Sequence, residues 1–187
     1  SSAATDWAAK LTQTSRDQHA ALAAGQATRR VAGNWRSATV LGAADFAAPE
    51  FKKAFEQPNI IFAFPGQGAQ IPAMGAALYQ TEPAFRAAFD AASDAAGLIA
   101  GRSLVDWLFS EDPADGNRLA QTELAQPALV AFGYAMTAYW ATFGLRPDAA
   151  IGHSVGEIGA ALAAGALSLV DAMSLAVARG RIMQDHA

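Results

Sequence analysis

The sequence has 187 residues, of which 52% are hydrophobic and 16% are charged, and it contains no cysteine. The hydrophobic fraction is sufficient for a buried core, while the formal net charge of −4 argues against a nucleic-acid-binding protein. The absence of cysteine excludes disulfide frameworks and thiolate metal sites, and it suits the reducing cytoplasm.

Residues 1–58 predict a small α/β element that is too short to form a core of its own. Residues 5–27 have the pattern of a helix, residues 30–42 hold short β-like pieces, and residues 47–57 predict a second helix that Pro58 ends. We expect this element to cap or link a larger domain.

From residue 59 onward, strands are predicted to alternate with helices. Residues 59–64 form a continuous apolar run, which is typical of a strand buried on both faces. The further predicted elements are helices over residues 73–80, 83–96, 124–143, 158–166 and 169–184, a strand over 148–151, and a turn followed by a loop over 104–116. Such alternation predicts an α/β fold with a parallel sheet covered by helices.

No segment indicates association with a membrane. The first thirty residues lack the apolar stretch of a secretory signal. The long apolar segment at residues 124–145 contains Gln126 and Pro127, and its large residues recur at helical spacing. We therefore expect a buried helix in this segment and a cytoplasmic location for the protein.

A Gly-x-Ser-x-Gly motif at residues 152–156 lies between a predicted strand and a predicted helix. In this setting the motif is typical of a nucleophile elbow, in which two glycines permit a tight turn and the hydroxyl of Ser154 is exposed above the strand. The following helix would direct backbone N–H groups at an oxyanion. The alternative is a capping box, Ser154-x-x-Glu157, in which the serine only caps the helix.

The loop after the first of these strands, residues 65–68, has the sequence Pro-Gly-Gln-Gly. Its backbone N–H groups would be free of bulky side chains, as an oxyanion loop requires. A plain strand-to-helix turn is the alternative.

Arg179 lies on the last predicted helix, which starts with Ser168 and Asp171 in a pattern typical of a capping box. Its side chain would need a partner, because a rotation of about 100° per residue places it on the apolar face of that helix. The neighbours on this face are Ala172, Leu175, Ala176, Ile182 and Met183. Arg179 would bind a substrate carboxylate in a bidentate manner, or pair with a buried carboxylate or backbone carbonyls.

Four segments together resemble the malonyl-CoA:acyl carrier protein transacylases, and most closely the acyltransferase domains of type I polyketide synthases. They are FAFPGQGAQ at residues 62–70, QPAL at 126–129, GHSVGE at 152–157 and RGRIMQ at 179–184. The resemblance spans residues 59–187. It implies an α/β-hydrolase-like acyltransferase subdomain with a parallel sheet, which would be incomplete in this chain. Residues 1–58 resemble, more weakly, the linker that joins ketosynthase to acyltransferase in those synthases.

This resemblance implies a role for four residues. Ser154 would be the acylated nucleophile, and the backbone N–H groups of Gln67 and Val155 would form the oxyanion hole. Arg179 would grip the free carboxylate of a malonyl-type group. The small aliphatic Val155 would also accompany malonyl rather than methylmalonyl as the extender unit.

The resemblance further implies the substrates and partners. The acyl group would pass from CoA to the serine and then to the phosphopantetheine thiol of an acyl carrier protein, with no metal or redox cofactor. Gln126, near the active site, and His153, next to the nucleophile, are further candidate substrate-binding residues, with a structural hydrogen bond as the alternative role for His153. An adjoining ketosynthase domain and the C-terminal half of the acyltransferase would be further partners.

The general base is the part of the family's pattern that this sequence does not supply. In the family it is a histidine well downstream of the serine, whereas the three histidines here are His19, His153 and His186. We therefore expect an N-terminal part of an acyltransferase that cannot activate Ser154 alone. A serine esterase with the same elbow and a non-catalytic docking fragment are the alternatives.

Overall fold

The computed structural model describes residues 18, 35–36, 52–53, 59–110 and 112–186. The chain divides into two compact units, Ser1–Pro58 and Asn59–Ala187, which are described separately.

The first unit contains two short strands, β1 (Trp35–Arg36) and β2 (Lys52–Lys53), which pair antiparallel. The helix predicted over residues 47–57 is therefore wrong at positions 52 and 53, where pairing with a distant strand outweighs the local pattern. Most other predicted segments of residues 1–58, and His19, lie outside the described residues. The assignment of this unit to a linker stays a prediction.

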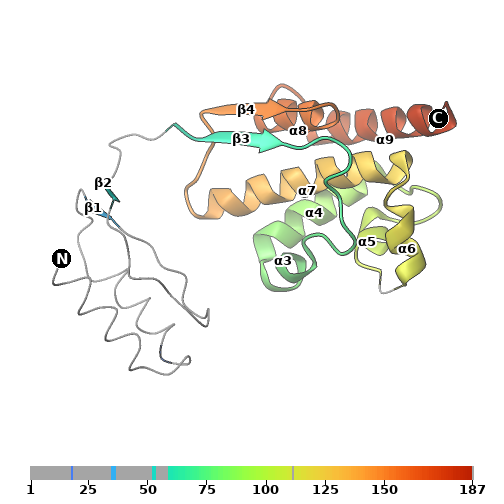
Figure 1. Ribbon diagram of the computed structural model, residues 1–187, viewed down its shortest axis with the longest axis horizontal. Coiled ribbons are helices and arrows are strands. Elements are labelled where there is room, and N and C mark those ends of the chain that lie inside the picture. The colour runs from blue at the N-terminus through green and yellow to red at the C-terminus, as the bar shows by residue number, and fades with distance from the viewer. Residues whose placement is uncertain (1–17, 19–34, 37–51, 54–58, 111, 187) are drawn as a thin grey trace. The chain divides into compact units, whose positions relative to one another are not determined.

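The second unit combines a parallel pair of strands with a set of helices (Figure 1). The strands β3 and β4 align from Ile61 opposite Ala149 to Phe64 opposite Gly152. In chain order the elements are β3 (Ile61–Phe64), α3 (Ala76–Thr81), α4 (Pro83–Ala96), α5 (Leu104–Leu108), α6 (Pro113–Arg118), α7 (Thr122–Thr142), β4 (Ala149–Gly152), α8 (Gly156–Ala163) and α9 (Leu169–Asp185). The predicted strands, their parallel pairing and the long helices are thereby confirmed.

The turn and loop predicted over residues 104–116 are instead two short helices, because each has a local cap. The Ser103 side chain accepts a hydrogen bond from the N–H of Asp106, and the Asp106 carboxylate bonds the N–H of Ser103 in return. The Asp112 carboxylate accepts from the N–H of Ala114 at the start of α6. Such caps satisfy N–H groups that a short helix leaves unpaired.

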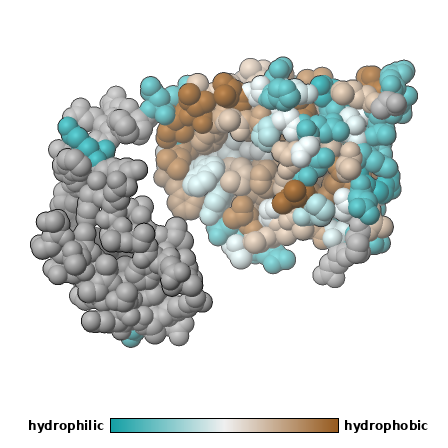
Figure 2. Space-filling model, in the orientation of Figure 1, coloured by the Kyte–Doolittle hydropathy of each residue, from teal (hydrophilic) through white to brown (hydrophobic). Residues whose placement is uncertain are grey.

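The prediction that β3 is buried on both faces is wrong within the described residues. Ile61 and Ile151 are 59% and 60% exposed on one face of the pair, whereas Phe62 and Phe64 on the other face are half-buried. The reason is that the described helices pack on the side of Phe64 only. Figure 2 shows hydrophobic residues gathered at the end of the second unit where β3 begins and α7 ends.

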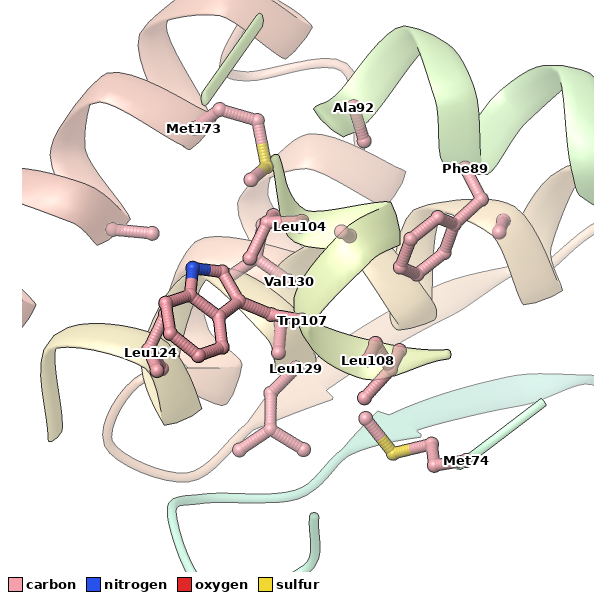
Figure 3. Close-up of a cluster of buried hydrophobic side chains, with 14 of the residues drawn as sticks. Met74, Phe89, Ala92, Leu104, Trp107, Leu108, Leu124, Leu129, Val130 and Met173 are labelled. Atoms are coloured by element: carbon pink, nitrogen blue, oxygen red, sulfur yellow. The ribbon is translucent and has the colours of Figure 1, made fainter. Parts of the chain in front are cut away.

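The hydrophobic core lies between α4, α5, α7 and α9 (Figure 3). Phe89 of α4, Leu104 of α5, Leu124 of α7 and Met173 of α9 are fully buried in it. None of the helices in the described ranges is long and apolar enough to cross a membrane. The first half of α7 is buried along its whole circumference, including the polar side chain of Gln126, which is 0% exposed.

Candidate active site

Ser154 occupies a sharp turn between β4 and α8. Its backbone has a φ of 56°, in the left-handed region that non-glycine residues rarely adopt. Strain of this kind is typical of functional positions and, after a strand and before a helix, of a nucleophile elbow.

Two glycines allow this turn to lie against the end of β3. A Cβ added to Gly152 would be 2.2 Å from the carbonyl oxygen of Gly156, and one added to Gly156 would be 2.2 Å from the carbonyl oxygen of Phe64. The N–H of His153 also donates to that Phe64 carbonyl at 3.1 Å. The elbow is therefore held beside the loop that follows Phe64.

The hydroxyl of Ser154 does not cap α8. The N-cap of this helix is Val155, and no side chain makes a capping hydrogen bond there. The Ser154 hydroxyl instead accepts a hydrogen bond from Nη2 of Arg179 at 3.1 Å. The capping-box alternative is wrong for this serine, because its left-handed backbone and its bond to α9 leave no capping bond to α8.

Arg179 joins Ser154 to the buried amide of Gln126. Its Nη1 donates to Oε1 of Gln126 at 2.6 Å, and Nε2 of Gln126 points to the sulfur of Met183 at 3.3 Å. No carboxylate or backbone carbonyl pairs with Arg179 among the described residues, so that alternative is not supported. A half-buried guanidinium without a counter-ion beside a serine hydroxyl is able to bind an anionic group.

The apolar neighbours predicted for Arg179 are buried only in part. Ala172 and Ala176 are fully buried, whereas Leu175 and Ile182 are 47% and 59% exposed. The difference arises because no described element covers that side of α9.

The two backbone N–H groups expected to form the oxyanion hole have no acceptor among the described residues, and the same holds for those of Gly66 and Ser154. The expected pair belongs to Gln67, in the loop after β3, and to Val155, directly after the serine. The next N–H of the loop, at Gly68, is bonded to Oε1 of Gln70 at 2.7 Å. Gln67 is exposed and Val155 is the N-cap residue of α8, so both N–H groups are free to donate to a bound group, as an oxyanion requires. The side chain of Val155 is fully buried in the core.

Neither histidine of the described part makes a hydrogen bond to the hydroxyl of Ser154. His153 is exposed and lies beside Gly66, and no described residue makes the structural hydrogen bond considered for its side chain. His186 is exposed at the end of α9.

Two residues with no predicted role also take part in the site. The side chain of Gln67 donates to the hydroxyl of Thr122 at 3.1 Å, and the N–H of Thr122 donates to Oε1 of Gln184 at 2.8 Å. Their positions in the sequence indicate that they lie near the site. Thr122 precedes Gln126 by one helical turn, and Gln184 is the last residue of the segment that starts with Arg179.

Comparison with known proteins places this geometry in a family. The family model described as "Acyl transferase domain" matches residues 61–187. A curated relative, the phenolphthiocerol synthesis polyketide synthase type I Pks15/1 of Mycobacterium marinum, is 46% identical over 121 residues, which are 65% of this chain and 6% of that protein.

Solved structures give the same result. The acyl transferase domain of ZmaA aligns with a TM-score of 0.70 and 32% identity over 78% of this chain and 34% of that one. A malonyl-transacylase solved in complex with a type II polyketide synthase acyl-carrier protein aligns with a TM-score of 0.60 and 31% identity, over 70% and 40%. The predicted resemblance and the acyltransferase fold are confirmed, and the chain spans well under half of these structures.

Proposed function

Because the chain belongs to the acyl transferase domain family, we propose that it transfers a malonyl-type group from CoA to the phosphopantetheine thiol of an acyl carrier protein. Membership establishes the acyltransferase class, and relatives such as Pks15/1 support a polyketide synthase setting. The serine intermediate, the malonyl group and the carrier protein are the proposed details.

In the first half-reaction, Oγ of Ser154 attacks the carbonyl carbon of the CoA thioester and loses its proton to a base. The N–H groups of Gln67 and Val155 bind the oxyanion of the tetrahedral intermediate. Their lack of other acceptors among the described residues supports this role. The C–S bond then breaks and CoA leaves as a thiol. The product of this step is a malonyl ester on Ser154.

In the second half-reaction, the phosphopantetheine thiol attacks this ester. The thiol gives up its proton, the ester C–O bond breaks, and Oγ of Ser154 regains a proton. The structure of a related malonyl-transacylase with an acyl-carrier protein supports this kind of acceptor. No step in this scheme uses a metal or redox cofactor. A ketosynthase domain next to the acyltransferase remains a further proposed partner.

The base that accepts the serine proton is proposed to come from a part of the domain outside this chain. No described histidine makes a hydrogen bond to the hydroxyl of Ser154, and the chain covers 34% and 40% of the two aligned structures. On this proposal, the chain is inactive alone and is completed by the remainder of the domain.

A single contact carries the proposal, namely the bond between Nη2 of Arg179 and Oγ of Ser154 at 3.1 Å. It places an unpaired positive charge next to the proposed nucleophile, where the free carboxylate of a malonyl ester would lie. A simple esterase would have no use for that charge.

The test is intact-mass analysis of a protein that carries the whole domain, after incubation with malonyl-CoA. We expect a malonyl adduct that is absent in Ser154→Ala and retained in Ser174→Ala, since Ser174 is exposed on α9 and its side chain makes no hydrogen bond to a described residue. Absence of an adduct in the unaltered protein would refute the transferase proposal. Turnover of simple esters that does not depend on Arg179 would favour an esterase.

A further inference from the structure

The first turns of α7 connect the separate segments of the candidate site. The oxyanion loop follows β3, the elbow follows β4, and Arg179 lies on α9, so that these three segments are distant in the sequence. Two residues of α7, Thr122 and Gln126, make hydrogen bonds that join them.

Thr122 holds the side chain of Gln67, because its hydroxyl accepts from Nε2 of Gln67 at 3.1 Å across 55 residues of sequence. No other side-chain hydrogen bond of Gln67 occurs within the described ranges. This bond therefore restrains the residue whose backbone N–H is the proposed oxyanion donor.

Thr122 is also joined to α9. It is the first residue of α7, whose N-cap residue, Gln121, makes no side-chain capping bond. The N–H of Thr122 is instead satisfied by Oε1 of Gln184 at 2.8 Å, so α9 caps α7 from outside.

The two helices approach closely at this point because of a glycine. A Cβ added to Gly180 would be 2.9 Å from the carbonyl oxygen of Thr122 and 3.1 Å from Cα of Glu123. Gly180 follows Arg179 directly, so the backbone of α9 contacts α7 next to the arginine that bonds Ser154.

Gln126, one turn after Thr122, repeats the arrangement. Its Oε1 accepts from Arg179, which donates in turn to Ser154. One face of α7 is thus hydrogen-bonded to the Gln67 loop through Thr122, and to the nucleophile through Gln126 and Arg179. Each of these two sets of bonds also includes a residue of α9.

We propose that Thr122 is a positioning residue for the acyl transfer, whose hydroxyl fixes the Gln67 loop relative to the elbow and α9. This inference rests on the proposed function, since it assigns the Gln67 N–H to the oxyanion. Thr122 itself does not touch the substrate. It acts through Gln67, while Arg179 is held separately by Gln126.

The proposal predicts different effects on the rate of acylation and on KM. The oxyanion exists only in the transition state and the tetrahedral intermediate, so a displaced Gln67 lowers the rate of acylation at saturating malonyl-CoA and hardly changes KM. The preference for malonyl over acetyl remains, because Arg179 keeps its own support. Displacement of a catalytic group by about 1 Å is able to reduce a rate about 100-fold, and partial displacement less.

The experiment measures single-turnover acylation of the whole domain by malonyl-CoA in Thr122→Val and Thr122→Ser. Valine keeps the shape of threonine and the backbone N–H that donates to Gln184, but it lacks the hydroxyl. We expect Thr122→Val to be about 10- to 100-fold slower at saturation with an unchanged malonyl-to-acetyl ratio, and Thr122→Ser to recover most of the rate. The matched control is Thr142→Val on the same helix, since the Thr142 hydroxyl donates to the carbonyl of Tyr139 and bonds no other described residue.

Three results would overturn the positioning role: a rate of Thr122→Val within twofold of the unaltered protein, a loss confined to KM, or a serine variant as slow as the valine variant. If the unaltered protein forms no malonyl ester, the proposed function fails first and this inference fails with it. The two failures are therefore distinguishable.

Discussion

On the proposed function, replacing Arg179 by alanine should remove most of the proposed preference for malonyl over acetyl groups. Nη2 of Arg179 lies 3.1 Å from the hydroxyl of Ser154, so a malonyl ester formed there would extend its free carboxylate towards the guanidinium. An acetyl ester has no such group. The ratio of the two loading rates therefore isolates the interaction with the carboxylate.

The size of the effect follows from the geometry of the guanidinium. Nη1 of Arg179 is already bonded to Gln126 at 2.6 Å, which leaves Nη2 as the donor nearest to the substrate. A hydrogen bond to a charged group contributes about 1.5–3 kcal/mol. Because about 1.4 kcal/mol corresponds to a factor of ten, the malonyl-to-acetyl ratio should decrease by a factor of about 10 to 150.

The assay is competition between malonyl-CoA and acetyl-CoA, with both adducts quantified by intact mass. Arg181→Ala is the matched control, since Arg181 lies two residues further on α9, is exposed, and its side chain makes no hydrogen bond to a described residue. A ratio that is unchanged in Arg179→Ala would refute the carboxylate clamp. An equal fall in Arg181→Ala would show a general charge effect instead.

Two further predictions concern stability. Gly156→Ala should destabilise the domain by up to about 2 kcal/mol in urea unfolding. Its Cβ would lie 2.2 Å from the Phe64 carbonyl oxygen, and overpacking of this kind costs about 1–3 kcal/mol, against a gain of about 1 kcal/mol in helix propensity. A stabilised variant would contradict the close packing. A hydrogen bond from Ser110 and the Arg102 guanidinium at 2.7 Å lower the pKa of the Asp115 carboxyl in the folded protein. The ionised carboxylate therefore stabilises the fold above about pH 4, and this stabilisation is lost as the pH falls through the lowered pKa. Asp115→Asn should therefore be less stable than the unaltered protein at pH 7 and equally stable at the acidic end of a pH series of unfolding curves, and a constant difference would refute this account.

Much of the fold could be predicted because its signals are local. The apolar run at residues 59–64 and the periodicity of residues 83–96 predict β3 and α4 without knowledge of the rest of the chain. The apolar run at residues 104–109 predicts only a turn, whereas the capping box of Ser103 and Asp106 starts the helix α5 there. Exposure of Ile61 could not be predicted, because it depends on which elements cover the strand.

The candidate site shows the same division. The Gly-x-Ser-x-Gly motif and the apolar surroundings of Arg179 single out residues whose chemistry is apparent from their type and spacing. Their partners are less apparent, since Thr122 and Gln184 are ordinary polar residues near two helix ends. Only their hydrogen bonds connect them to Gln67 and to α7.

The sequence by itself determined the family, the parallel α/β arrangement and a serine on a turn between a strand and a helix. The tertiary structure decided between the two interpretations of that serine. A capping box depends on residues three apart, and both are present in the sequence. The bond from Arg179 spans 25 residues and exists because α9 packs on α7 and directs the guanidinium to the elbow, which is a property of helix packing rather than of any local pattern.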